Sequence, residues 1–268
     1  MPEGHTLHRL ARLHAGRYAG HRVTVSSPQG RFAAGAAQLD GQVFTGAQAY
    51  GKHLFHDYGG HGVVHVHLGL YGGFTEFELP EPDPVGQVRM RIVGPRHATD
   101  LRGPNRCELL TDAEADAITA RLGSDPLRPD ADPAPAFDRI ARSAAPIAGL
   151  LMDQEVLAGV GNVYRAEVLY RHGLNPMLPG RAAGRERAAE LWDDLVVLMA
   201  EGVRIGRIDT VRPEHLPEVT GRAPREDRHG GEVYVYRRAG LPCHVCGATV
   251  VMRELLGRKL YWCPSCQE

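Results

Sequence analysis

The sequence predicts an α+β protein: an N-terminal antiparallel β-sandwich that begins with a helix, then a helical domain and a four-cysteine zinc finger. Three observations support this prediction. Short segments that alternate apolar and polar residues dominate about the first 100 residues, and helical periodicity follows after about residue 137. Four of the five cysteines lie in the last 26 residues, in two closely spaced pairs.

The N-terminal half contains one short helix followed by strands. Leu7, Leu10 and Leu13 suit one face of a helix that ends near Gly16. Gly-rich or Pro-rich turns separate the segments that follow, which indicates antiparallel strands with one buried face. The expected strands are residues 22–26, 63–68, 74–78 and 87–92.

Composition shifts divide the chain into domains. A stretch rich in proline and aspartate indicates a linker at residues 125–136, after an N-terminal sandwich domain at 1–124. Residues 137–230 are expected to be helical, and 231–268 to form the zinc finger. The individual helices are expected at 112–122, 146–157, 163–171 and 185–203.

The overall composition is that of an ordinary soluble globular protein. The hydrophobic fraction is 43%, the charged fraction is 24%, and the net charge is −1. No apolar run is long enough for a membrane span, and the first residues do not form a signal peptide. We therefore expect a cytoplasmic monomer without membrane contact. A net charge near zero does not indicate nucleic-acid binding, although it is compatible with a local basic face.

The cysteine spacing predicts one structural zinc ion. Two CxxC turns, Cys243–Cys246 and Cys263–Cys266, are separated by 16 residues, a spacing typical of a tetrahedral four-thiolate site. Disulfides are the weaker alternative in a cytoplasmic protein. The fifth cysteine, Cys107, is expected to be a small core residue.

Two short stretches suggest contact with nucleic acid. Arg258 follows Gly257 between the cysteine pairs, where a tight hairpin turn would place it to grip a phosphate or enter a groove. A solvated turn charge is the alternative. In GVGN, residues 159–162, Asn162 is a good N-cap for the next helix, whose backbone N–H groups would suit a phosphate. Alone, this stretch is also an ordinary helix junction.

Motifs spread along the chain resemble the formamidopyrimidine-DNA glycosylase and endonuclease VIII family. They are PEG at 2–4, GKHL at 51–54, GVGNVYRAE at 159–167 and GRKLYWCPSCQ at 257–267. The LGLYG at 68–72 is more similar to the endonuclease VIII branch. The resemblance implies a β-sandwich, a helix–two-turns–helix and a zinc finger. It further implies a nucleoid-associated enzyme that excises oxidised bases, with pyrimidines favoured, and cuts the abasic strand of damaged DNA by β/δ-elimination.

The first residues carry the expected catalytic chemistry. Once Met1 is removed, Pro2 presents an α-amino group, which is far more often neutral near pH 7.5 than a lysine amine. Such an amine can form a Schiff base with the sugar, and Glu3 beside it can protonate the ring oxygen. The resemblance assigns the same roles to Pro2 and Glu3, and assigns to Lys52 a phosphate contact that assists base loss. An exposed lysine at a strand end is the alternative for Lys52.

The resemblance also identifies Leu70 and Tyr71 as side chains that fill the space left by an everted base. A core position is the alternative for Leu70. The chain departs from the family pattern at Thr6, where a second glutamate is frequent, and at Gly69, where a bulkier polar residue is common. At these two positions the resemblance therefore implies neither a second carboxylate nor complete filling of the space left by the base.

Two further interpretations complete the sequence analysis. His65 and His67 alternate like a metal pair, but without an evident third ligand we interpret them as sheet residues. A non-catalytic DNA-binding protein with the same scaffold is the main alternative function, and it would need neither a free Pro2 nor Glu3. A zinc-ribbon module for protein contacts leaves GVGN and Lys52 unexplained.

Overall fold

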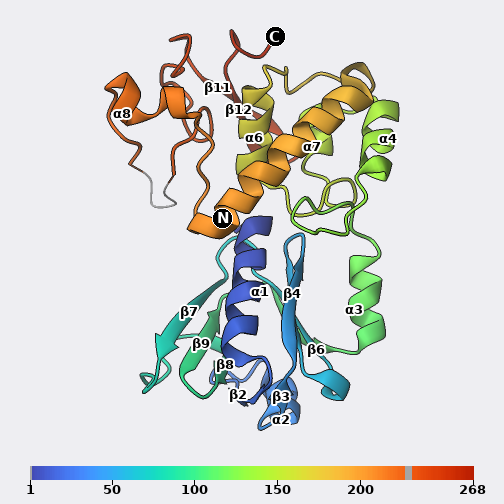
Figure 1. The fold of residues 1–268 in the computed structure, drawn as a ribbon, viewed down its shortest axis with the longest axis vertical. Helices are drawn as coiled ribbons and strands as arrows, with labels where there is room; N and C mark the ends of the chain where they lie inside the picture. Colours follow the sequence, from blue (N-terminus) through green and yellow to red (C-terminus); the bar gives the residue numbers. More distant parts are fainter. Residues whose placement is uncertain (1, 227–230) are drawn as a thin grey trace. The chain divides into compact units, whose positions relative to one another are not determined.

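The computed structural model describes residues 2–226 and 231–268, in two compact units (Figure 1). The first unit extends to Arg121 and the second begins at Leu122. Each unit has its own buried core and is described by itself.

The first unit is built on two four-stranded antiparallel sheets. One sheet has the order β2-β8-β9-β7 and the other has the order β10-β6-β5-β4. Side chains from both sheets and from α1 share one apolar core. The strands are β2 (Thr24–Ser26), β4 (Gly46–Tyr50), β5 (His53–Asp57), β6 (Val63–His67), β7 (Gly73–Glu78), β8 (Val88–Val93), β9 (His97–Arg102) and β10 (Arg106–Leu110), with a small β1 (His21–Arg22) and β3 (Val43–Phe44) pair.

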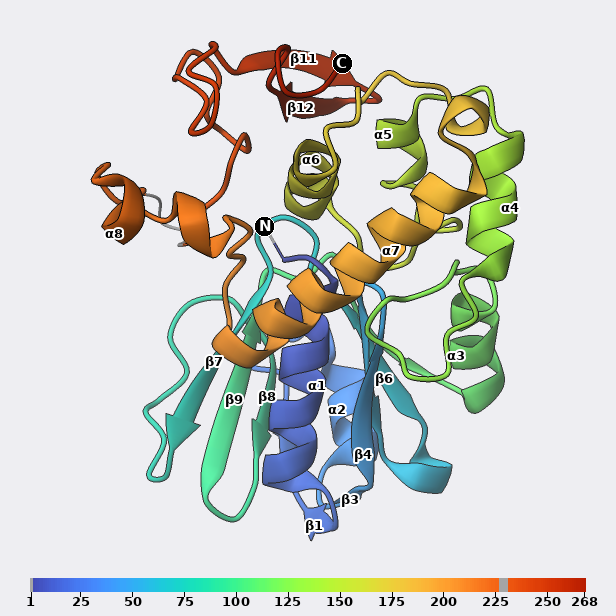
Figure 2. The same cartoon turned by 45° about the horizontal axis from the view of Figure 1, so that its top comes forward.

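Helix α1 (Gly4–Tyr18) lies along β4 and β5 (Figure 2). The backbone N–H of Gly20 donates to the Phe44 carbonyl at 2.9 Å, which fixes the C-terminal end of the helix beside β3. Further back along the helix, His14 Nδ1 lies 2.9 Å from His56 Nε2 on β5. The helix therefore runs alongside the hairpin formed by β4 and β5.

A polar cluster joins α1 to the other sheet through Glu76 on β7. His14 Nε2 lies 3.1 Å from one Glu76 oxygen, while Arg17 and the Thr99 hydroxyl donate to the other. Because Thr99 donates to Glu76, the Tyr18 hydroxyl donates to Thr99 at 2.6 Å. Burial alone would raise the pKa of Glu76, but the His14 and Thr99 hydrogen bonds and the Arg17 charge hold it below its ordinary value.

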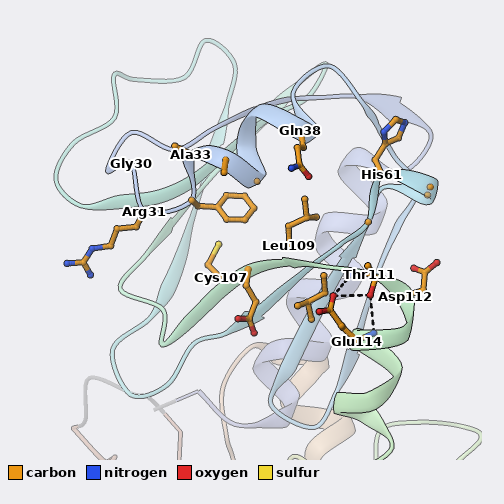
Figure 3. A pocket seen from close by; sticks show the side chains of 18 residues that line it. Gly30, Arg31, Ala33, Gln38, His61, Cys107, Leu109, Thr111, Asp112 and Glu114 are labelled. Carbon is orange, nitrogen blue, oxygen red and sulfur yellow. Dashed lines mark hydrogen bonds between the residues drawn. The ribbon is translucent and has the colours of Figure 1, made fainter.

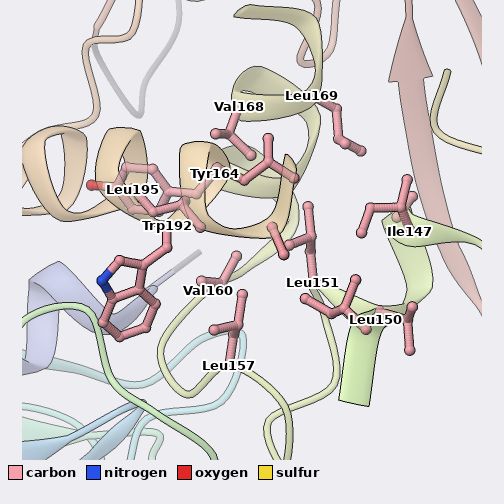
Figure 4. Packing of buried hydrophobic residues seen from close by; sticks show 14 of the residues in the cluster. Ile147, Leu150, Leu151, Leu157, Val160, Tyr164, Val168, Leu169, Trp192 and Leu195 are labelled. Atoms are coloured by element: carbon pink, nitrogen blue, oxygen red, sulfur yellow. The ribbon is translucent and has the colours of Figure 1, made fainter. Parts of the chain in front are cut away.

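The second unit begins with helices packed around one apolar core (Figure 4). Side chains of Tyr164 and Val168 on α6 meet Trp192 and Leu195 on α7, over the Ile147–Leu151 segment. The helices are α4 (Ala134–Arg142), α5 (Ile147–Leu150), α6 (Asn162–Arg171) and α7 (Gly180–Ile205), the last interrupted by non-helical backbone at Gly184. A third cluster joins α6 to the C-terminal hairpin of β11 (Val251–Leu255) and β12 (Arg258–Trp262).

The remaining elements are short. In the first unit these are α2 (Ala33–Leu39), a 3-10 turn at Gly59–His61 and α3 (Asp112–Thr119), which begins with a capping box of Thr111 and Glu114. In the second unit, a 3-10 turn at Pro213–His215 and α8 (Pro217–Thr220) precede the C-terminal hairpin. Among the described residues, no helix combines the length and the apolar character that crossing a bilayer requires.

The expected helix at 146–157 is wrong beyond its first turn. After α5 the chain forms tight turns, in which the Asp153 side chain accepts from the Glu155 N–H at 3.0 Å. Gln154 accepts from the Gly159 N–H, also at 3.0 Å. Such side-chain bonds to the backbone compete with the helical ladder. The helix expected at 185–203 is confirmed, since regular helix follows Gly184.

The histidines of the first unit should make its stability depend on pH. Burial lowers the pKa of His5 to about 4 and of His53 to about 3, and it also lowers the pKa values of His56, His65 and His67. An unfolded chain takes up these protons near pH 6.5, whereas the folded unit does not until lower pH. The contribution of these histidines to the free energy of unfolding is therefore fully present above pH 6.5, and it is lost as the pH is lowered toward 4.

We predict that the melting temperature falls by several degrees between pH 7.5 and pH 5, before carboxylates titrate. Differential scanning calorimetry at constant ionic strength measures this. His53→Gln, which removes one such group, should make the fall shallower. A melting temperature that stays constant over this range would contradict the prediction.

Candidate nucleic-acid and catalytic site

The chain's first described residues are held in place by helix α1. Glu3 is the N-cap residue of α1 and is fully buried, and its carbonyl accepts from the Thr6 N–H at 2.9 Å. The Glu3 side chain does not cap the helix. Pro2, just before it, is partly exposed. An acid is therefore fixed beside an accessible imino acid at the chain's beginning.

Helix geometry brings this beginning to the turn that carries Lys52. Glu3 precedes His14 by eleven residues, a length of about 16 Å at 1.5 Å per residue. From the strand position beside His14, about four strand residues cover roughly 13 Å to the Gly51–Lys52 turn. The start of α1 and this turn therefore lie at the same end of the sheet (Figure 1, Figure 2).

Strand pairing brings the loop between β6 and β7 to the same end. His53, directly after Lys52, pairs with His67, directly before the loop. In that loop Tyr71 is 92% exposed and Leu70 is 42% exposed. The alternative of a core position for Leu70 is therefore wrong. Two large apolar side chains project from the end of the unit that holds Pro2, Glu3 and Lys52.

Asn105 lies beside Gly69 in this loop. Gly69 has φ +69°, and a Cβ built there would lie 2.3 Å from the Asn105 side-chain oxygen. The Asn105 side chain thus occupies the space that a larger residue at position 69 would need. Its backbone N–H also donates to the His67 carbonyl at 2.9 Å, which ties the two segments together.

The adjacent face of the sheet is a hollow of about 670 Å³ with a basic rim. It is lined by His53, His67, Arg89 and residues 105–108. Burial lowers the pKa values of His53 and His67, so both imidazoles are neutral at pH 7. The positive charge of this hollow therefore comes from Arg89 and Arg106. His65 bonds to His53 at 2.8 Å and to Glu108 at 3.0 Å, which agrees with a sheet role.

A larger cavity, of about 980 Å³, lies elsewhere in this unit (Figure 3). It is lined by α2 and the segment before it, the turn at 59–62 and the chain from Cys107 into α3. None of the predicted site residues lines it. Cys107 is buried, belongs to the core, and has a pKa raised to about 12 by burial, so its predicted structural role is confirmed.

The prediction that Asn162 caps α6 is wrong, because Gly161 is the N-cap. Asn162 is only 5% exposed, and its amide donates to the Lys259 carbonyl at 2.8 Å. Its oxygen accepts from Arg165, which also donates to the Ala148 carbonyl at 3.3 Å. The side chain therefore holds the zinc-finger hairpin against the start of α6 rather than capping the helix.

The hairpin turn consists of Leu256 and Gly257, with φ angles of 51° and 70°. Arg258 is the exposed first residue of β12, beside the turn rather than at its tip. Gly257 and Arg258 belong to the turn predicted from the sequence, whereas Leu256, which is 78% exposed, does not. The signal was present, since a leucine before the turn glycine breaks the usual Asn-Gly pattern.

The four predicted cysteines form a metal site. All four Sγ atoms lie within 4.8 Å of one another, with Cys243 and Cys266 3.9 Å apart and Cys246 and Cys263 3.4 Å apart. A tetrahedral zinc with Zn–S bonds of about 2.3 Å requires sulfur separations of about 3.8 Å. The donor set and its dimensions fit one structural zinc ion.

One side chain on α6 and one directly after the last cysteine support this site. The Tyr170 hydroxyl on α6 lies 3.1 Å from Cys243 Sγ and 3.9 Å from Cys266 Sγ. Gln267 accepts from the Cys263 N–H and donates to the Leu174 carbonyl at 3.0 Å. Zinc, hairpin and α6 thus form one connected assembly.

Comparisons with known proteins agree with this architecture. Family models match over three segments: the formamidopyrimidine-DNA glycosylase N-terminal domain at 1–107, its H2TH domain at 122–213, and a zinc finger found in FPG and IleRS at 240–268. The chain is 56% identical to endonuclease 8 1 of Mycobacterium tuberculosis, over the full length of both. It is 35% identical to the Thermus thermophilus formamidopyrimidine-DNA glycosylase, over 75% of this chain and 74% of the relative.

Solved structures show the same fold. The wild-type Lactococcus lactis Fpg bound to DNA containing N7-benzyl-Fapy-dG superposes with a TM-score of 0.79 at 20% identity, covering all of both chains. The same enzyme with DNA containing an oxidised pyrimidine gives a TM-score of 0.79 at 19% identity. The α+β fold predicted from the sequence, with its β-sandwich and zinc finger, is confirmed.

We predict one zinc per chain and an effect of the Tyr170 hydroxyl on its retention. Hydroxyl donors to thiolate ligands orient them, and losing such a partner typically costs about 10- to 100-fold in metal affinity. Tyr170→Phe should therefore release zinc to a colorimetric chelator at about tenfold lower chelator concentration. Tyr261→Phe is the matched control in the same small core. Equal zinc retention by all three proteins would contradict the role of Tyr170.

Proposed function

The chain is a DNA glycosylase of the formamidopyrimidine-DNA glycosylase and endonuclease VIII family, and we propose that it excises oxidised bases, pyrimidines above all, and then cuts the abasic strand. The observation that carries this proposal is the start of α1, where buried Glu3 is held beside partly exposed Pro2. A protein that only binds DNA would not need this pair.

The proposed reaction begins with the Pro2 amine after removal of Met1. Its nitrogen attacks C1′ of the damaged nucleotide, and the C1′–O4′ bond breaks as the ring oxygen takes a proton from Glu3. The Pro2 nitrogen then loses its proton, and the base departs with the electrons of the glycosidic bond, which leaves an iminium between Pro2 and C1′. This iminium acidifies the C2′ proton, whose loss expels the 3′ phosphate by β-elimination. A second elimination releases the 5′ phosphate, and water then frees Pro2.

Glu3 and Lys52 complete the proposed machinery. The Glu3 carboxyl protonates the ring oxygen as the sugar opens, a task that requires the position beside Pro2. Lys52, on the turn at the same end of the sheet, contacts a phosphate of the damaged strand. Thr6 and the neutral His5 stand where a second carboxylate would be expected, so we assign this site one carboxylic acid.

Leu70 and Tyr71 fit the proposed role of filling the duplex once the base has left the stack. In the free protein their apolar surface is unfavourably exposed to water, and insertion into DNA would remove that surface from water. Asn105 supplies a polar side chain beside Gly69, which supports filling by three residues instead of two. The partner is damaged DNA, bound by a monomer.

Comparison of two forms of the protein tests the proposal. The processed form, beginning at Pro2, should be trapped on abasic-site DNA by borohydride and should cleave it. A form that retains Met1 or carries an N-terminal tag should lose both activities, because its proline nitrogen is an amide. Equal trapping by both forms would show that another residue supplies the reacting amine, and Lys52 would be the first candidate. Absence of trapping by either form would favour the non-catalytic DNA-binding protein.

Glu3→Gln separates base excision from strand cleavage. It should slow the release of an oxidised pyrimidine by about 100-fold or more, as expected for loss of a general acid. Trapping at a preformed abasic site should fall much less, since an abasic sugar opens to its aldehyde in water and no base remains to be expelled. Gel electrophoresis of both substrates measures the two steps. An equal loss on both substrates would contradict the assigned role.

Arg258 and Asn162 should differ in their effect on DNA affinity. Arg258→Ala removes a phosphate contact and should lower the slope of log affinity against log salt by about 0.9. Asn162→Ala should weaken binding at every salt concentration with an unchanged slope, because its buried amide positions the hairpin. Fluorescence anisotropy measures both, with exposed Arg187→Ala as the control. A lowered slope for Asn162→Ala would mean that this side chain reaches phosphate.

A further inference from the structure

The tip of the zinc-finger hairpin carries an unfavourable residue. Leu255 pairs with Arg258, so Leu256 and Gly257 are the two central residues of the turn, and both have positive φ. This is the backbone of a type I′ turn, which favours Asn-Gly or Gly-Gly. A bulky leucine with φ 51° is an outlier, because its Cβ crowds the following carbonyl.

The same leucine is exposed to solvent. Leu256 is 78% exposed, whereas its neighbour Leu255 packs against the helical core. One of its methyl carbons lies 3.2 Å from the position of a Cβ built on Gly149, so the side chain rests beside α5. The free protein thus bears both backbone strain and an exposed apolar side chain at this point. Strained backbone of this kind clusters at functional sites, including sites that hold a ligand.

The charges around Leu256 indicate the partner. Arg253, Arg258 and Lys259 are exposed on the same hairpin, against one exposed acid, Glu254. A basic surface with an apolar side chain at its centre fits an anionic polymer that also has apolar edges. Duplex DNA has this combination, with phosphates on its rim and sugar and base edges inside its grooves.

We propose that Leu256 is an apolar DNA contact that enters a groove beside Arg258 and packs against sugar and base edges. This inference rests on the proposed function, because it assigns a contact within DNA binding. Leu256 adds affinity without charge, while Arg258 holds the backbone. The hairpin tip therefore binds DNA through an ionic contact from Arg258 and an apolar contact from Leu256. The apolar contact accounts for a leucine at this strained position.

The test compares three variants of the zinc-loaded full-length chain on a duplex with a tetrahydrofuran abasic analogue. Leu256→Asn installs a residue that the turn favours and removes the apolar group. It should raise the melting temperature slightly while weakening DNA binding by about tenfold, the effect of one buried leucine side chain. The salt slope should stay unchanged. Leu241→Asn, the same change at another exposed leucine of the zinc finger, should leave affinity unchanged.

Each outcome has a distinct meaning. Wild-type affinity for Leu256→Asn would overturn the inference, and so would an equal loss for Leu241→Asn. A change in oligomeric state by light scattering, with DNA affinity unchanged, would instead assign Leu256 to a protein contact and overturn it. Failure of the wild-type chain to bind this duplex would refute the proposed function itself. Arg258→Ala, with its lowered salt slope, shows in the same assay that the hairpin reaches DNA.

Discussion

The Glu76 carboxylate joins the first helix to the sandwich, and the position of the chain's beginning depends on it. Chain termini usually fray, because few contacts oppose their conformational entropy. Here His14, Arg17 and Thr99 all bond to Glu76, and Tyr18 bonds to Thr99. The helix cannot slide or rotate without breaking this cluster. As a result Glu3 is fully buried only two residues from the start of the sequence.

A buried carboxylate, Glu167, has a comparable task in the helical unit. Glu167 on α6 accepts from the backbone N–H groups of Tyr234, Val235 and Tyr236, and from the Thr210 hydroxyl. Buried charge is costly unless hydrogen bonds satisfy it, and four donors satisfy this one. The carboxylate thereby fixes the chain that leads into the zinc finger. In each unit, hydrogen bonds to one carboxylate thus fix a helix against a strand or a loop.

Sequence reasoning succeeded where local rules determine structure. Metal-ligand spacing, for example, predicted the four-cysteine site. It failed where long-range partners decide burial. Strands β5 and β9 contain His56, Thr99 and Asp100, polar residues that are buried because other strands bond or pack against them. For example, Arg91 on β8 donates twice to Asp100, at 2.6 and 2.8 Å.

The predicted site shows the same limit. Asn162 has the composition of a cap, but a partner 97 residues away in the sequence determines its conformation. Leu256 departs from the usual Asn-Gly turn pattern in the sequence, but only the structure gives its positive φ angle and its exposure. Lys52, Leu70 and Tyr71 were identified through resemblance. Strand register then explains why Lys52 and the loop lie together, since His53 pairs with His67.

The central claim is that the nitrogen of Pro2 bonds to the DNA sugar, and the site of the covalent adduct tests it most directly. Borohydride-trapped complex would be digested with nuclease and trypsin, and the modified peptide sequenced by tandem mass spectrometry. The account predicts a sugar remnant on the proline of the peptide at residues 2–9. A remnant on Lys52, recognised by missed tryptic cleavage within residues 32–89, would contradict it.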